Sequence, residues 1–193
     1  MTAAASLDRM AMGGGGWSAR GPLPSTLLRM HRDDRTHLLV TGGTAERRAA
    51  VAHAFHDESP VRAGPLLIVD CSTQAARLDE ALDCWLSILH RDSPDNPLRA
   101  AERGTLFLDH VESLAPLTQR RLLAFARALS DGALAHWAGR LTTGSAHPLE
   151  GAVASGSMLP ELFDCLDQVR IALAQSATEA PRCDRSPHST FCC

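Results

Sequence analysis

The chain has 193 residues, of which 45% are hydrophobic and 21% charged, and its formal net charge is −3. This length and composition fit one domain with a substantial core, and the charge gives no whole-chain attraction to nucleic acid or to anionic membranes. All 19 basic residues are arginine, which excludes a Schiff-base lysine, a lysine general base and the lysine of a standard phosphate loop. We therefore expect no direct DNA binding. We also expect no membrane association, since no apolar run approaches the roughly 18 residues of a membrane span.

The two ends of the chain differ from its middle. Residues 1–22 are small and Gly-rich and predict a disordered leader without the apolar stretch of a signal peptide. Residues 176–193 predict a disordered tail, in which the spacing of Cys183, His188, Cys192 and Cys193 matches no structural zinc pattern. No metal is expected there. Cysteines without an export signal indicate reduced thiols, so the predicted location is the cytoplasm.

Between residues 23 and 175, short apolar runs alternate with amphipathic segments. Runs of this length, bounded by turn signals, predict strands that are buried on both faces of a sheet. Five such runs follow one another along the chain: His37–Val40, Leu66–Val69, Thr105–Leu108, Arg140–Thr143 and Val169–Leu173.

Helical periodicity separates these predicted strands. The expected helices are Arg47–His56, a helix from about Ser72 with Leu78, Leu82, Trp85, Leu86 and Leu89 facing inward, Leu117–Leu129, and Leu159–Leu166. Alternation of strands and helices implies parallel strands joined by right-handed crossovers, a three-layer α/β fold. The dibasic pairs Arg47-Arg48 and Arg120-Arg121 are typical of solvated helix faces.

Two motifs carry a more specific message. Thr41–Arg48 lies after a predicted strand and before a helix, where a phosphate loop belongs. Gly104–Asp109 is a strand that ends in an acid, the Walker B pattern. The chain here resembles the AAA+ core of the bacterial sigma-54-dependent transcriptional activators, whose corresponding motifs read T-G-E-S-G-T-G-K-E and G-T-L-F-L-D-E.

The resemblance extends over residues 36–173. It includes Ser59-Pro60, Pro65–Cys71, Gln119 with Leu122 and Leu123, and Arg140–Ile171. It implies a P-loop NTPase-like AAA+ core with about five parallel strands. We expect no helical lid domain, because the sequence stops before the position of the family's lid. It also implies that Cys71 and His56, which match family residues, are structural.

The phosphate loop departs from the family pattern. Matched position by position, the residues at the nucleotide site are Gly42, Gly43, Arg47, Arg48 and Asp109, with Arg48 at the lysine and Arg47 at the glycine before it. Ala45 and Glu46 replace a glycine and a threonine, and Glu46 adds negative charge where phosphates would lie. A phosphate loop needs glycines and a compact cation. The segment therefore predicts either a degenerate nucleotide site or only a tight turn into the helix.

The catalytic positions are also substituted. The resemblance makes Asp109 the magnesium-water ligand and places His110 where the family has the glutamate that polarises the attacking water. A neutral imidazole can act as a base in principle; the alternative is a polar residue at the exposed end of a central strand. The sensor asparagine falls on Ala146, and the two arginines that act across subunits fall on Ser157 and Leu159.

These departures predict a protein that is not an enzyme and has no required cofactor. We expect a non-catalytic, sigma-54-activator-like regulator that acts through contacts with an AAA+ activator or with the sigma-54 transcription machinery. The residues at 85–97 lack the family's G-A-F-T-G-A loop, which grips sigma-54. Two alternatives remain: a switch that binds ATP and Mg²⁺ weakly without hydrolysis, and a genomic remnant with no selected role.

Overall fold

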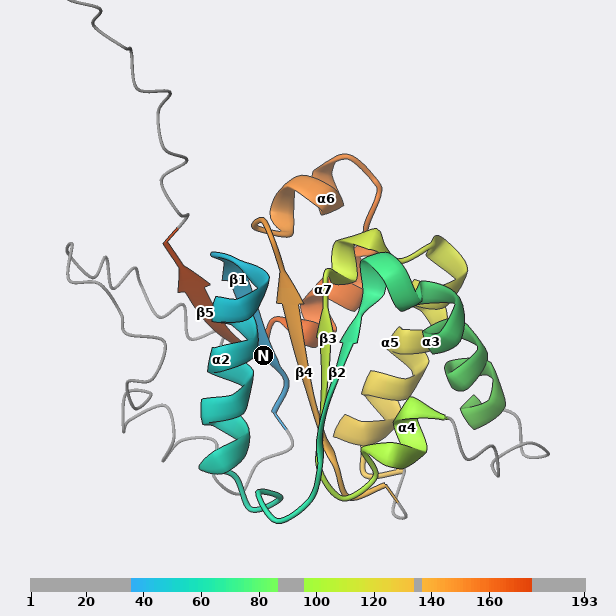
Figure 1. Ribbon diagram of the computed structural model, residues 1–193. Helices are drawn as coiled ribbons and strands as arrows, with labels where there is room; N and C mark the ends of the chain where they lie inside the picture. The colour runs from blue at the N-terminus through green and yellow to red at the C-terminus, as the bar shows by residue number, and fades with distance from the viewer. Residues whose placement is uncertain (1–35, 87–95, 134–136, 175–193) are drawn as a thin grey trace, which may run out of the picture.

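The computed structural model describes residues 36–86, 96–133 and 137–174 (Figure 1). All of them lie within the region 23–175 that was expected to fold. The expected leader and tail, the three tail cysteines and Leu89 lie outside the described residues.

A five-stranded sheet forms the centre of the molecule, with the strand order β2-β3-β4-β1-β5 and every adjacent pair parallel. The strands are β1 (Leu38–Gly42), β2 (Leu66–Asp70), β3 (Thr105–Asp109), β4 (Arg140–Ser145) and β5 (Val169–Leu173). The first strand lies between the last two, so the carboxyl ends of β1, β3 and β4 are neighbours. In an open parallel sheet, ligand sites form at the carboxyl ends of the strands.

Four longer helices appear where periodicity predicted them, and three short ones were not predicted. The helices are α2 (Ala45–Asp57), α3 (Cys71–Leu86), α4 (Pro97–Ala100), η1 (Val111–Ser113), α5 (Pro116–Ser130), α6 (Glu150–Ala154) and α7 (Pro160–Leu166). The three missed helices, α4, η1 and α6, have five residues or fewer. Segments this short carry no readable helical period.

Alternate residues of β1 pack into two different cores, which makes the fold three-layered. Leu38 and Val40 contact Val51 and Phe55 of α2, whereas Leu39 belongs to the larger core formed with α3, α5 and α7. Successive side chains of a strand point to opposite faces of the sheet. The predicted α/β fold is confirmed, with α2 on one face and α3 and α5 on the other (Figure 1).

Two details of the expected burial were wrong. Only β1, β3 and β4 are buried along their whole length, because β2 and β5 are the edge strands of the sheet. Ile68 of β2 is 39% exposed and β5 alternates between half-buried and exposed residues. Leu86, expected to face the core, is 46% exposed as the last residue of α3, at the margin of the core.

Candidate functional site

The turn from β1 into α2 is much shorter than a phosphate loop. The strand ends at Gly42 and the helix begins at Ala45, which leaves Gly43 and Thr44 between them. Both glycines have positive φ, 78° and 63°, a conformation that residues with a Cβ adopt only with strain. The Thr44 side chain caps α2 by accepting a hydrogen bond of 3.3 Å from the Arg47 amide.

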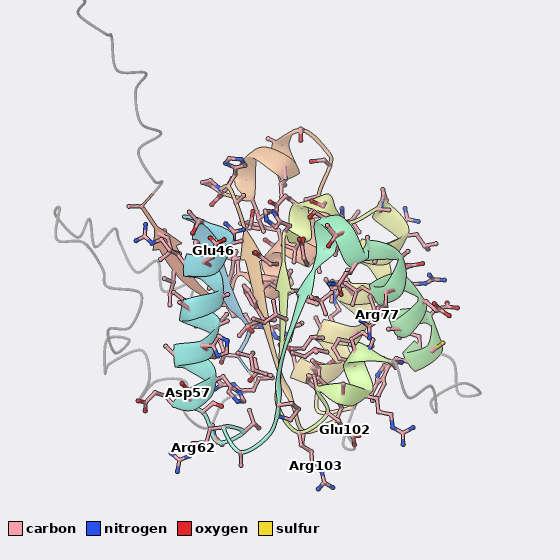
Figure 2. The ribbon with its side chains drawn as sticks, in the orientation of Figure 1. Glu46, Asp57, Arg62, Arg77, Glu102 and Arg103 are labelled. Carbon is pink, nitrogen blue, oxygen red and sulfur yellow. The ribbon has the colours of Figure 1, made fainter. Side chains whose placement is uncertain are left out.

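This turn changes which backbone groups face the site. Residues 45–48 form the first turn of α2, and the Arg48 amide bonds to the Thr44 carbonyl at 3.0 Å. A phosphate loop instead presents a series of free amides around the phosphates. Glu46, labelled at the upper end of α2 in Figure 2, is exposed in that first turn. Bonds from its own amide and the Thr44 hydroxyl lower the pKa of Glu46, so the helix N-terminus keeps a negative charge.

The Arg48 side chain points from α2 toward the carboxyl ends of the strands and is only 1% exposed. Its guanidinium holds the Asp109 carboxylate through two parallel bonds, Nε to Oδ1 at 2.7 Å and Nη2 to Oδ2 at 2.9 Å. Asp109, at the end of β3, is 4% exposed. The expectation that Arg48 belongs to a solvated dibasic pair is wrong, because Arg48 shares the helix face of Val51 and Phe55.

The other guanidinium donors also have acceptors. Nη1 donates to the Gly42 carbonyl at 3.3 Å and to the Gly43 carbonyl at 3.0 Å, and Nη2 donates to Nε2 of His110 at 3.0 Å. A guanidinium has five N–H groups. The two bonds to Asp109 and these three therefore use every one of them.

His110 extends this network toward β4. Arg48 can only donate, so Nε2 of His110 accepts and the proton lies on Nδ1. Nδ1 then donates to Oε1 of Glu112 at 3.3 Å, and the same oxygen accepts the Ala146 amide at 3.1 Å. His110 has left-handed backbone angles, φ 57° and ψ 44°, and its side chain is only 27% exposed. It is thus a bonded member of the network and not a free residue at an exposed strand end.

Gly144 of β4 makes room for the carboxylate, and sequence reasoning missed it. A Cβ at this position would lie 2.4 Å from Oδ1 of Asp109 and 2.8 Å from Cζ of Phe107. The predicted strand Arg140–Thr143 stopped one residue short of Gly144, whereas the observed β4 contains it. A glycine inside a strand often marks close approach of another group.

Arg47 diverges from Arg48. Its Nη1 donates to the carbonyl of Ala174, just beyond β5, at 3.3 Å. Arg140 begins β4 and therefore lies at the amino ends of the strands. Its guanidinium lies 4.4 Å from the Phe55 ring centre. Neither arginine reaches the Asp109 carboxylate.

The positions matched to the trans-acting arginines have structural contacts. Ser157 bonds to the carbonyl of Ala152 at 3.1 Å through its hydroxyl. The Leu159 amide donates to the buried side chain of Gln119 at 2.8 Å, and that side chain in turn donates to the Ser157 carbonyl. Gln119 thereby holds the segment before α7.

The remaining candidates, Cys71 and His56, are buried. Cys71 is fully buried, and burial raises the pKa of its thiol. His56 is buried with Nδ1 2.9 Å from the Thr105 hydroxyl. In the described part of the chain no three His, Cys, Asp or Glu side chains gather as a metal site, and no helix is long and apolar enough to cross a membrane.

The sheet order, the strand–turn–helix after β1 and the acid ending β3 define the class, a P-loop NTPase fold of the AAA+ type. NtrX from Brucella abortus in complex with ADP superposes with a TM-score of 0.57 at 22% identity, over 77% of this chain and 34% of that one. The P-loop NTPase domain of a sigma-54 activator from E. coli gives 0.53 at 19%, over 73% and 98%.

Sequence comparison narrows the class to a family. The acetoin catabolism regulatory protein of Cupriavidus necator is 31% identical over 152 residues, 73% of this chain and 23% of that protein. The Nif-specific regulatory protein of Herbaspirillum seropedicae is 27% identical over 71% and 27%. No family model matches. The chain is a divergent relative of the AAA+ domain of sigma-54-dependent activators, as the motif order predicted, and it spans about a quarter of these relatives' length.

Proposed function

We propose that this protein is a non-catalytic relative of the sigma-54 activators, which takes part in transcription regulation through protein contacts and without nucleotide turnover. One observation carries the proposal: the guanidinium of Arg48 occupies the corner between the β1–α2 turn and Asp109. In an active site of this class that corner holds phosphate oxygens and magnesium.

The charge and polarity of the corner support this reading. A nucleotide brings negative phosphates and needs donors around them. Here the corner is lined by acceptors, the carbonyls of Gly42 and Gly43 and the carboxylate of Asp109, and a cation of the same chain fills it. Both Asp109 oxygens accept from Arg48, so this carboxylate is not free to bind magnesium.

The groups around the corner favour the same conclusion. The Nε2 lone pair of His110 is engaged by Arg48, so His110 is not free to act as a base toward an attacking water. Ser157 and Leu159 bring no charge to a neighbouring subunit. A trans-acting arginine accelerates phosphoryl transfer by roughly 10³–10⁵-fold. The role we assign is cooperation with an intact AAA+ activator or with the sigma-54 machinery. This role places the protein in the cytoplasm.

Titration with ATP tests the proposal. We expect no heat of binding and no rise in melting temperature with millimolar Mg-ATP, since ligand binding to the folded state alone must raise it. ATPase turnover is expected to be indistinguishable from buffer. Binding that is lost in Asp109→Ala, measured on samples that remain folded, would instead establish the weak ATP-binding switch and contradict the proposal.

The partner side of the proposal needs a second experiment. The full-length chain is purified from its native host under mild conditions, and associated proteins are identified. We expect an AAA+ activator or sigma-54 among them. A strictly monomeric protein without such a partner contradicts the proposed regulatory role.

A further inference from the structure

The guanidinium of Arg48 is matched donor for donor by its surroundings. Its five N–H groups meet Asp109 twice, His110 once, and the carbonyls of Gly42 and Gly43 once each. Burying an arginine with unpaired donors is costly. Loss of nucleotide binding alone would not be expected to leave one acceptor for each guanidinium donor.

The backbone at four positions is shaped around this arrangement. Gly42 and Gly43 have positive φ and carry the two carbonyls that accept from Nη1. Gly144 lacks the Cβ that would overlap the carboxylate of Asp109. The left-handed backbone of His110 accompanies the bond from its Nε2 to Arg48. These residues lie at or near the carboxyl ends of β1, β3 and β4, which are far apart in the sequence.

We propose that this corner is a guanidinium-binding site whose ligand is part of the same chain. Arg48 is a permanent internal ligand, and it ties the β1–α2 turn to the end of β3 in place of a bound nucleotide and metal. The inference rests on the proposed function and deepens it: the protein holds one conformation of its sheet edge independently of any small molecule.

The proposal specifies a ligand class for the emptied site. Without the Arg48 side chain, the corner offers the Asp109 carboxylate, the carbonyls of Gly42 and Gly43 and Nε2 of His110. These acceptors suit a small planar cation with several N–H groups, such as methylguanidinium, better than a single ammonium donor centre.

Thermal unfolding of Arg48→Ala provides the test. We expect its melting temperature to lie on the order of 10 °C below that of the wild type, because the charge of Asp109 is left buried and unpaired. Methylguanidinium at low millimolar concentration, below any denaturing effect, should restore a few degrees. The same concentration of methylammonium should not.

Matched controls decide whether the rescue is specific. Arg121→Ala, which removes a surface arginine, and the double variant Arg48→Ala/Asp109→Ala should show no rise with methylguanidinium. Equal rises in all variants, or no rise in Arg48→Ala, overturn the proposal.

A milder variant covers the case in which Arg48→Ala does not fold. Arg48→Lys keeps the charge but replaces the planar fork by one nitrogen, so we expect a melting temperature several degrees below that of the wild type. A value equal to the wild type overturns the proposal. ATP binding by the wild type refutes the proposed function directly, whereas failed rescue without ATP binding removes only the internal-ligand inference.

Discussion

Two arginines of this chain look alike in sequence and differ in their surroundings. Arg48 and Arg121 are each the second residue of an Arg-Arg pair on a helix, and each reaches two carboxylate oxygens. Arg48 holds both oxygens of Asp109 with its side chain 1% exposed. Arg121 bridges Asp79 at 2.5 Å and Asp83 at 2.6 Å with its side chain 22% exposed.

The difference teaches how burial decides what an ion pair does. A buried pair is expensive to break, since the remaining charge loses both its partner and its water. A surface pair is screened and its members regain hydration when separated. Arg48–Asp109 therefore fixes the β1–α2 turn against the end of β3, whereas Arg121 adds only a contact between α5 and α3.

The largest effect is expected when the buried ion pair Arg48–Asp109 is broken. Arg48→Met removes the charge and keeps most of the length, and we expect a loss of about 3–5 kcal/mol in the free energy of unfolding, measured with urea. Adding Asp109→Leu to Arg48→Met should recover much of that loss, since no charge is then left unpaired. A double variant less stable than the single one would contradict this account.

Gly144→Ala tests the room left for the carboxylate. The new Cβ would overlap Oδ1 of Asp109 and the Phe107 ring, so we expect a loss of about 1–3 kcal/mol. Gly151→Ala is the matched control, because no atom lies within 4 Å of the added Cβ in α6. A Gly144→Ala protein as stable as Gly151→Ala would show that the carboxylate can move without cost.

His37 offers a buried titratable group at the opposite edge of the sheet. Burial lowers the pKa of His37, which lies against the Ala126 carbonyl and the Ser130 hydroxyl. The unfolded chain then binds more protons than the folded one, so stability is lost as pH falls below the unfolded value of about 6.5.

We expect this loss to reach at most about 1.4 kcal/mol per pH unit, measured by urea unfolding between pH 5 and 8. The pH slope should shrink in His37→Gln and stay unchanged in His53→Gln, because His53 is exposed. An unchanged slope in His37→Gln would assign the pH dependence to other groups.

The smallest expected effect concerns the surface half of the comparison. Arg121→Met should cost about 0.2–1 kcal/mol, and the cost should shrink further in 1 M salt, where surface charges are screened. The salt dependence is compared with that of Arg48→Met, whose larger loss should change little. A loss for Arg121→Met above 3 kcal/mol would erase the distinction between the two pairs.

Much of the fold followed from local patterns. Apolar runs placed all five strands and helical periodicity placed the four longer helices. Three short helices were missed for want of a period, and β2 and β5 were taken as fully buried because strand order cannot be read from a run of apolar residues. The motif order predicted the family relationship that the relatives support.

The features of the site also fall into those that the sequence determined and those that it did not. The sequence by itself determined that lysine is absent, that Arg48 stands at the lysine position and that Asp109 ends a strand. Even the burial of Arg48 had a signal, since it lies three and seven residues before the buried Val51 and Phe55.

Only the tertiary structure decided where that arginine goes. The acceptors for its five donors come from residues 42, 43, 109 and 110, and Gly144 from a third strand makes the space. Hydrogen-bond matching depends on distances between segments that are remote along the chain. The substitutions alone predicted a degenerate nucleotide site, whereas the fold shows the Arg48 guanidinium filling the corner between the β1–α2 turn and Asp109.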